Sequence, residues 1–141
     1  METAMRKTRI LAIAPYEGLR EVLMNEASVF SDQIEITAYL GDLSAGLDVA
    51  CSLEGANYDV VLSRGGTAEL LEKNLPLPVV DVVPSVLDVL RFVRLARNTP
   101  CRRAIVAFPA IADIARKLFY LLEQQEDIHT IHNAQEAEEI I

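Results

Sequence analysis

The chain has few of the residues that build metal and redox centres. It contains two cysteines, two histidines and no tryptophan among 141 residues. Cys51 and Cys101 lie far apart and match no metal-ligand or redox spacing, which suits a reducing cytosol. His129 and His132 fall three residues apart in an expected strand, so their side chains would point to opposite faces. We therefore expect no metal site, no cofactor and no cysteine-based catalysis.

Long apolar runs and net positive charge are also missing. No apolar stretch is long enough to span a membrane, and the mixed charges of residues 1–7 are not followed by the apolar segment of a signal peptide. The formal net charge of −8 would repel a nucleic-acid backbone. With 51% hydrophobic residues, the chain can nevertheless bury a substantial core. These features predict a cytoplasmic domain that contacts neither membrane nor nucleic acid directly.

Strand-like and helix-like patterns alternate along the chain. Short apolar runs and alternating runs predict strands, and apolar residues at helical spacing predict helices. The expected strands are 9–14, 34–40, 58–63, 79–83, 104–108 and 128–131. The expected helices are one through 19–30, then 44–56, 67–73, 85–97, 110–125 and one from about Ala134. Repeated β-α units predict an α/β fold of the flavodoxin or Rossmann kind, with a parallel sheet and helices on both faces.

The most informative segment joins the strand 58–63 to the next helix through Arg64-Gly65-Gly66-Thr67. Adjacent glycines allow positive φ values and a concave arrangement of backbone N–H groups. The helix behind them adds free N–H groups and a partial positive charge, and an arginine offers a planar fork of donors to a carboxylate or phosphate. The pattern predicts an anion-binding loop. Two plainer interpretations stay open: a tight turn at Gly65-Gly66, and an ion pair between Arg64 and Asp81 of the neighbouring strand.

Other loops follow the carboxyl ends of the expected strands, where open α/β sheets bind ligands. They are Pro15-Tyr16, Pro84-Ser85 and Pro109-Ala110. The fold class predicts that the helix N-termini behind these loops converge on one crevice. Ser85 is also spaced from Asp88 as in a capping box, so a structural role as helix cap competes with ligand binding there.

Three segments resemble the N-terminal domain of the propionate catabolism activator family, the PrpR type. They are the stretch from Ser63 to Leu70, the strand Pro78-Val79-Val80-Asp81-Val82, and the helix from Ser85 to Arg91. In that family an SRGGTA turn precedes a PVVE strand and a VSxYDILR helix. Pro15-Tyr16 and Ala107-Phe108-Pro109 extend the similarity. This chain departs from the pattern with Pro84 in place of an apolar residue, Val86-Leu87 in place of a small-aromatic pair, and Asp81 in place of Glu.

The resemblance implies a two-lobed, flavodoxin-like effector domain. Its first lobe would be residues 1–98, and 99–141 would begin a truncated second lobe, or supply a fifth strand and extension to a single domain. The family's domain precedes an AAA+ ATPase that works with sigma-54 RNA polymerase and a helix-turn-helix DNA-binding domain. It is thought to sense a small carboxylate such as propionate or 2-methylcitrate.

The resemblance also assigns roles to residues. Arg64, Gly65, Gly66 and Thr67 would form the anion cradle, Ser85 a second cradle, and Tyr16 a wall or hydrogen-bond donor. We expect homo-oligomers as well, because a truncated second lobe would leave apolar surface exposed.

Two other functions remain as alternatives. A phosphoacceptor receiver domain shares the expected sheet, but it needs acidic groups after the first strand, Asp after the third and Lys after the fifth. This chain has Ala14-Pro15, Ser63 and Phe108-Pro109 at those places. A small enzyme acting on a carboxylate or phosphorylated metabolite would need a nucleophile or acid–base group near the loop, where the chain offers no His or Cys. We expect a binding module with no catalytic residues.

Overall fold

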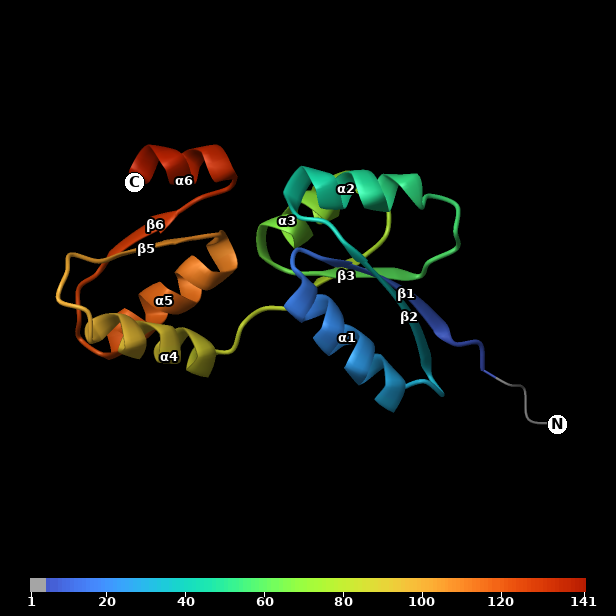
Figure 1. The fold of residues 1–141 in the computed structure, drawn as a ribbon, viewed down its shortest axis with the longest axis horizontal. Helices are drawn as coiled ribbons and strands as arrows, with labels where there is room; N and C mark the ends of the chain where they lie inside the picture. Colours follow the sequence, from blue (N-terminus) through green and yellow to red (C-terminus); the bar gives the residue numbers. More distant parts are fainter. Residues whose placement is uncertain (1–4) are drawn as a thin grey trace. The chain divides into compact units, whose positions relative to one another are not determined.

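The computed structural model describes residues 5–141, which form two compact units, one that extends to Val82 (unit 1) and one from Val83 to Ile141 (unit 2). Unit 1 alternates strands and helices in the expected order (Figure 1). Its elements are β1 (Thr8–Ala14), α1 (Glu17–Val29), β2 (Ile34–Leu40), α2 (Leu43–Ser52), β3 (Val60–Ser63), α3 (Gly65–Asn74) and β4 (Val79–Asp81). The strands form one parallel sheet in the order β2-β1-β3-β4. The predicted α/β fold is confirmed.

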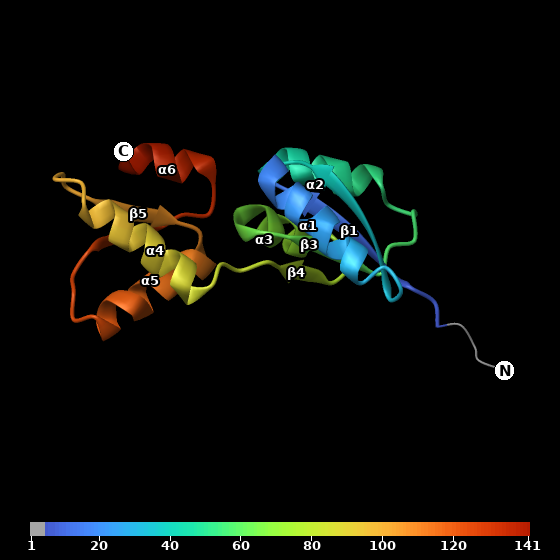
Figure 2. The same ribbon diagram turned by 60° about the horizontal axis from the view of Figure 1, so that its bottom comes forward.

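Helices cover both faces of this sheet (Figures 1 and 2). On one face Leu11, Ile13 and Val61 pack with Ala50 of α2 and Leu71 of α3. On the other face Ala12 and Ala14 of β1 pack with α1. Because β1 has helices on both faces and a strand on each side, its last four residues are fully buried, as its continuous apolar run predicts. The half-exposed strand β2 lies at the edge, where its alternating pattern places it.

Two glycines allow α2 to lie close to the loop that precedes it. A Cβ atom added to Gly46 would come 2.7 Å from the carbonyl oxygen of Gly41, 2.8 Å from Cγ2 of Thr67 and 3.0 Å from Cγ2 of Ile13. Real Cβ atoms do not approach other atoms this closely, so no side chain fits at Gly46 without movement of the backbone. This contact brings the loop after β2 against α3, directly behind the Arg64-Gly65-Gly66 loop.

Unit 2 has a smaller, two-stranded parallel sheet. Its elements are α4 (Val86–Arg97), β5 (Ala104–Ala107), α5 (Pro109–Leu121), β6 (Asp127–Thr130) and α6 (Ala134–Ile140). Val89 and Val93 of α4 pack against Ala115, Leu118 and Phe119 of α5.

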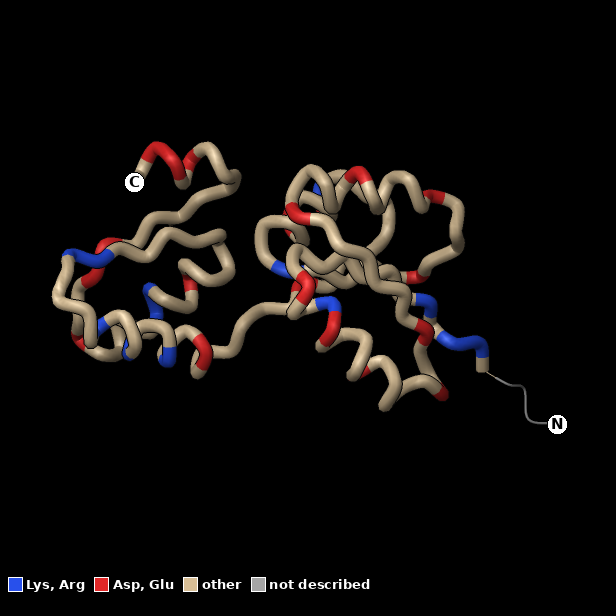
Figure 3. The backbone as a smooth tube through the Cα atoms, viewed as in Figure 1, with Lys and Arg blue, Asp and Glu red and all other residues tan. Residues whose placement is uncertain are grey.

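Basic residues at the start of β5 lie beside acidic residues at the start of β6 (Figure 3). Arg102 pairs with Asp127 at 3.7 Å and Arg103 with Glu126 at 3.5 Å. These ion pairs join the two strands where the sheet of unit 2 begins. In residues 5–141 no helix is long and apolar enough to cross a bilayer.

Two features of the structure bear on the expected organisation of the chain. The strands form two sheets, so the loop after β5 does not leave the sheet that carries the loops after β1, β3 and β4. The division at Val82–Val83 also precedes the predicted boundary at residue 98. The physical reason is the apolar face of α4, which packs on α5 and so places this helix in unit 2.

Candidate anion-binding site

The predicted loop lies at the topological switch point of the unit 1 sheet. From β1 the chain turns first to β2 on one side, and β3 then returns to the other side of β1. The loops after β1 and β3 therefore leave the same edge of the sheet in opposite directions, which is where open α/β sheets bind ligands. Asp81, the last residue of β4, pairs in register with Ser63 and adds a third group at this edge.

Tyr16 and Arg64 meet at the switch point. Nη1 of Arg64 donates a hydrogen bond to the Tyr16 hydroxyl at 2.6 Å, and the guanidinium carbon lies 6.0 Å from the centre of the tyrosine ring. Among the described residues Arg64 has no carboxylate within ion-pair distance, although Asp81 stands on the neighbouring strand. The proposed Arg64–Asp81 ion pair is therefore wrong, and the guanidinium keeps donors for another anion.

Gly65 shows the backbone conformation that the glycine pair predicts. Its φ is +59°, a left-handed value that glycine adopts without steric cost, and it begins α3 directly behind Arg64. Its N–H group, however, donates to Oδ1 of Asp81 at 3.0 Å. Asp81 thus has a structural partner, as its place in an apolar strand suggests, but the partner is a backbone amide of the loop.

The next two amides of the loop have no acceptor in the described part of the chain. Gly66 and Thr67 are buried, and they occupy the first turn of α3, where backbone N–H groups have no intrahelical partner. The first N–H group of α3 with a backbone acceptor is that of Ala68, which bonds to the carbonyl of Arg64 at 3.3 Å. Buried N–H groups nearly always have a partner in native proteins, so this pair of donors marks a place for a water molecule or an anion.

The Thr67 side chain serves the fold. Its hydroxyl donates to Oδ1 of Asp42 at 3.0 Å and accepts from the N–H of Leu43 at 2.9 Å, and the residue is 1% exposed. Asp42 is the N-cap residue of α2 but makes no side-chain capping bond, and its carboxylate accepts the hydrogen bond from Thr67. Leu43 takes a φ of +45°, an uncommon value for leucine, which these hydrogen bonds help to hold. The backbone N–H of Thr67 is therefore the group of this residue that remains for a ligand.

Ser85 belongs to unit 2, where it acts as a helix cap. Its hydroxyl accepts from the backbone N–H of Asp88, and the Asp88 carboxylate accepts from the backbone N–H of Ser85, a full capping box at the start of α4. The hydroxyl also donates to the same carboxylate at 2.8 Å. The structural role that its spacing from Asp88 indicates is thus confirmed, and a ligand role for Ser85 stays a prediction.

The receiver alternative loses support from the position of Ser63. This residue ends β3, where a receiver has its phosphoacceptor aspartate. Its side chain is fully buried and its hydroxyl donates to the carbonyl of Ile13 at 2.6 Å. This hydroxyl ties β3 to β1, and the position carries no carboxylate that could accept a phosphoryl group.

The site therefore combines free backbone donors, one guanidinium and a tyrosine at the switch point of a parallel sheet, the arrangement of flavodoxin-like binding domains. The model of the propionate catabolism activator family matches residues 30–141, and the chain belongs to this family. It is thus a regulatory domain of sigma-54-dependent transcriptional activators, as the resemblance at the Ser63–Leu70 segment predicts.

A solved structure has the same fold. The crystal structure of an NtrC family transcriptional regulator from Clostridium acetobutylicum matches with a TM-score of 0.71 and 19% sequence identity, covering 95% of this chain and 70% of that one. At this identity the similarity shows the fold alone. The search of curated proteins found no match.

Proposed function

We propose that the domain senses a small carboxylate metabolite of the propionate or 2-methylcitrate kind, and that it binds the carboxylate group between Arg64 and the start of α3. The observation that carries this proposal is the pair of buried N–H groups at Gly66 and Thr67, which lack an acceptor among residues 5–141. Two converging amides and a helix N-terminus favour a negative charge, and an adjacent guanidinium strengthens that preference.

The neighbouring side chains define how the anion is held. Tyr16 fixes the guanidinium through its hydroxyl, so Arg64 loses less conformational entropy on binding than a freely mobile side chain would. Asp81 already accepts from Gly65, so the ligand shares the loop with a carboxylate. Arg64 offsets the repulsion between the two anions and is therefore the residue on which binding depends most.

Two further statements belong to this proposal. In a longer activator the domain would control a downstream AAA+ ATPase and a helix-turn-helix module, which places its action in the cytoplasm. The domain also self-associates, because unit 2 exposes several large apolar side chains. Phe92, Leu95, Tyr120 and Leu121 are each at least two-thirds exposed.

A thermal-shift and calorimetry screen tests the ligand proposal. Propionate, 2-methylcitrate, citrate and inorganic phosphate would each be added to the purified chain. A ligand at 100 times its Kd stabilises a protein by about 2.7 kcal/mol, which shifts the melting temperature by several degrees. We expect a carboxylate to give this shift and phosphate to give a smaller one.

The Arg64→Ala variant locates the site. Losing a charge-assisted contact of roughly 1.5–3 kcal/mol should weaken binding by about 10- to 100-fold. Arg6→Ala is the matched control, since Arg6 carries the same charge but pairs with Asp59, near the opposite edge of the sheet. Tyr16→Phe should weaken binding by less, because it frees the guanidinium without removing it. Equal affinity in wild type and Arg64→Ala would remove this loop from the site.

A further inference from the structure

A carboxylate already stands beside the free amides of the candidate site. Oδ1 of Asp81 accepts from the N–H of Gly65 at 3.0 Å, and Gly66 follows Gly65 in the first turn of α3. Consecutive residues of a helix are offset by only about 1.5 Å along its axis. An anion bound at the amides of Gly66 and Thr67 therefore lies next to the Asp81 side chain, and its own charge must tolerate that of Asp81.

Other carboxylates follow the neighbouring strands at the same edge of the sheet. Glu17 begins α1 after β1, and Asp42 follows β2. The charge of Glu17 is balanced by Arg20, which donates to it. Among the described residues no cation forms an ion pair with Asp42 or Asp81, so Arg64 is left to balance these two charges and that of the ligand. Each additional negative charge on a ligand adds repulsion here, so the edge suits a ligand with a single negative charge.

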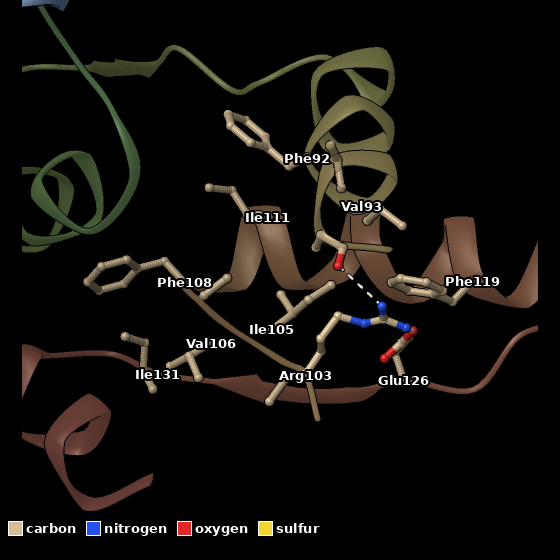
Figure 4. Close-up of a pocket in the computed structure, with 14 residues that line it drawn as sticks. Phe92, Val93, Arg103, Ile105, Val106, Phe108, Ile111, Phe119, Glu126 and Ile131 are labelled. Atoms are coloured by element: carbon tan, nitrogen blue, oxygen red, sulfur yellow. Dashed lines mark hydrogen bonds and ion pairs between the residues drawn. The ribbon is translucent and has the colours of Figure 1, made fainter. Parts of the chain in front are cut away.

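A pocket in unit 2 is less suited to an anion. It has a volume of about 430 Å³ and apolar walls from α4, β5 and α5 (Figure 4). Its charged lining residues, Arg103 and Glu126, pair with each other at 3.5 Å, and Arg103 also donates to the carbonyl of Ala96. The guanidinium at this pocket is therefore already bound to a carboxylate. The loop at Arg64 remains the better place for an anionic ligand.

Asp81 can also bind a group of the ligand directly. A carboxylate offers about four acceptor positions on its two oxygens, and the Gly65 amide uses one of those on Asp81. Asp81 is exposed, at the end of β4. It therefore keeps acceptor positions for a hydroxyl or ammonium group that a ligand carries beside its carboxylate. Such a hydrogen bond would offset the repulsion between the two carboxylates.

We propose that Asp81 determines the specificity of the site, which selects a singly charged carboxylate with a hydrogen-bond donor on the neighbouring carbon atom. The carboxylate of the ligand binds the amides of Gly66 and Thr67 and the guanidinium of Arg64. The hydroxyl or ammonium group on the next carbon donates to Asp81. Small 2-hydroxy and 2-amino monocarboxylates have this pattern of groups. The inference rests on the proposed function and narrows the class of ligand.

Isothermal titration calorimetry with acids of the same carbon skeleton tests the proposal. Propionate has no donor on its second carbon atom, lactate has a hydroxyl there, and alanine has an ammonium group. We expect lactate or alanine to bind the purified chain about 10- to 100-fold more tightly than propionate, which is the effect of one charge-assisted hydrogen bond. The acid that binds more tightly identifies the donor. Citrate, with its additional carboxylates, should bind more weakly than that acid.

Substitutions of Asp81 test whether this residue causes the preference. Asp81→Ala removes both the acceptor and the repelling charge, so the preference should disappear while propionate still binds. Asp81→Asn keeps an acceptor for the Gly65 amide, and the preference should fall severalfold because a neutral acceptor makes the weaker hydrogen bond. Asp42→Asn is the matched control. It neutralises another carboxylate at this edge and should leave the ratio of the affinities for lactate and propionate unchanged.

The outcomes separate this inference from the proposed function. Equal affinities of the wild-type chain for propionate, lactate and alanine would overturn the role of Asp81. A preference that persists in Asp81→Ala would do the same, as would an undiminished preference in Asp81→Asn if the alanine variant does not fold. In these cases a loss of binding in Arg64→Ala would still support the carboxylate site. If none of the acids binds to the wild-type chain or to the Asp81 variants, the proposed function fails and this inference fails with it.

Discussion

Replacing Thr67 with valine separates the structural role of this side chain from a role in ligand binding. Valine keeps the shape of threonine but removes the hydroxyl, which links α3 to the loop before α2 through Asp42 and Leu43. A hydrogen bond to a carboxylate contributes about 1.5–3 kcal/mol, and an amide left without an acceptor costs about 1–3 kcal/mol. Asp42 is exposed and regains water, so both effects fall toward the lower ends of their ranges. We expect Thr67→Val to lower the free energy of unfolding by about 2 kcal/mol.

Urea denaturation followed by circular dichroism measures this change. With a slope of about 2 kcal/mol per molar urea, the midpoint should fall by about 1 M. Thr67→Ser keeps the hydroxyl and should lose less than half as much stability. If Thr67→Val is as stable as wild type but binds ligand more weakly, the hydroxyl belongs to the ligand site and our structural assignment is refuted.

Three further substitutions test other contacts. Gly46→Ala should destabilise the fold by about 1–3 kcal/mol or more in thermal melts, because its Cβ would meet the rigid carbonyl of Gly41; a neutral result would contradict this packing. The backbone N–H of Arg9 donates to the Asp59 carboxylate and lowers the pKa of Asp59 below its usual value. This carboxylate therefore stabilises the fold above the unfolded-state pKa near 4, and the stabilisation is lost as pH falls through the lowered pKa. Asp59→Asn should accordingly be less stable than wild type at pH 7, with the difference closing in melts below about pH 4. Ser85→Ala removes a capping box and should cost about 1 kcal/mol in urea denaturation, and calorimetry on the same variant tests the predicted ligand role of the Ser85 hydroxyl.

Local sequence patterns are sufficient to predict the elements of this fold. The continuous apolar run of β1 indicates a strand buried on both faces, and the alternation in β2 indicates an edge strand. Both predictions follow from the spacing of apolar residues along the strand and from the number of its faces that are buried. These properties depend on residues that are close together in the sequence. The ends of helices are predicted less closely. The sequence predicts a helix over residues 44–56, whereas α2 ends at Ser52 in the structure.

The grouping of these elements into units could not be predicted in the same way. The helical pattern of α4 shows that it has an apolar face but does not show which surface that face covers. In the structure Val89 and Val93 pack against α5, so α4 joins the residues that follow it in sequence. The surface against which a helix packs depends on the shapes of the two surfaces and on contacts between residues far apart in the sequence. The spacing of apolar residues within the helix does not specify these.

The same limit applies to the candidate site, where sequence predicts the donors but not their occupancy. A strand, two glycines and a helix indicate that N–H groups converge at Gly65, Gly66 and Thr67. The structure shows that the first of these already donates to Asp81, a residue from another strand. A ligand is then left with two amides and the guanidinium of Arg64, beside a carboxylate that repels it. Since two neutral donors must act against this charge, the guanidinium decides whether an anion binds. Its contribution should therefore exceed the 0–1 kcal/mol typical of a surface ion pair, and Arg64→Ala should weaken binding by at least tenfold.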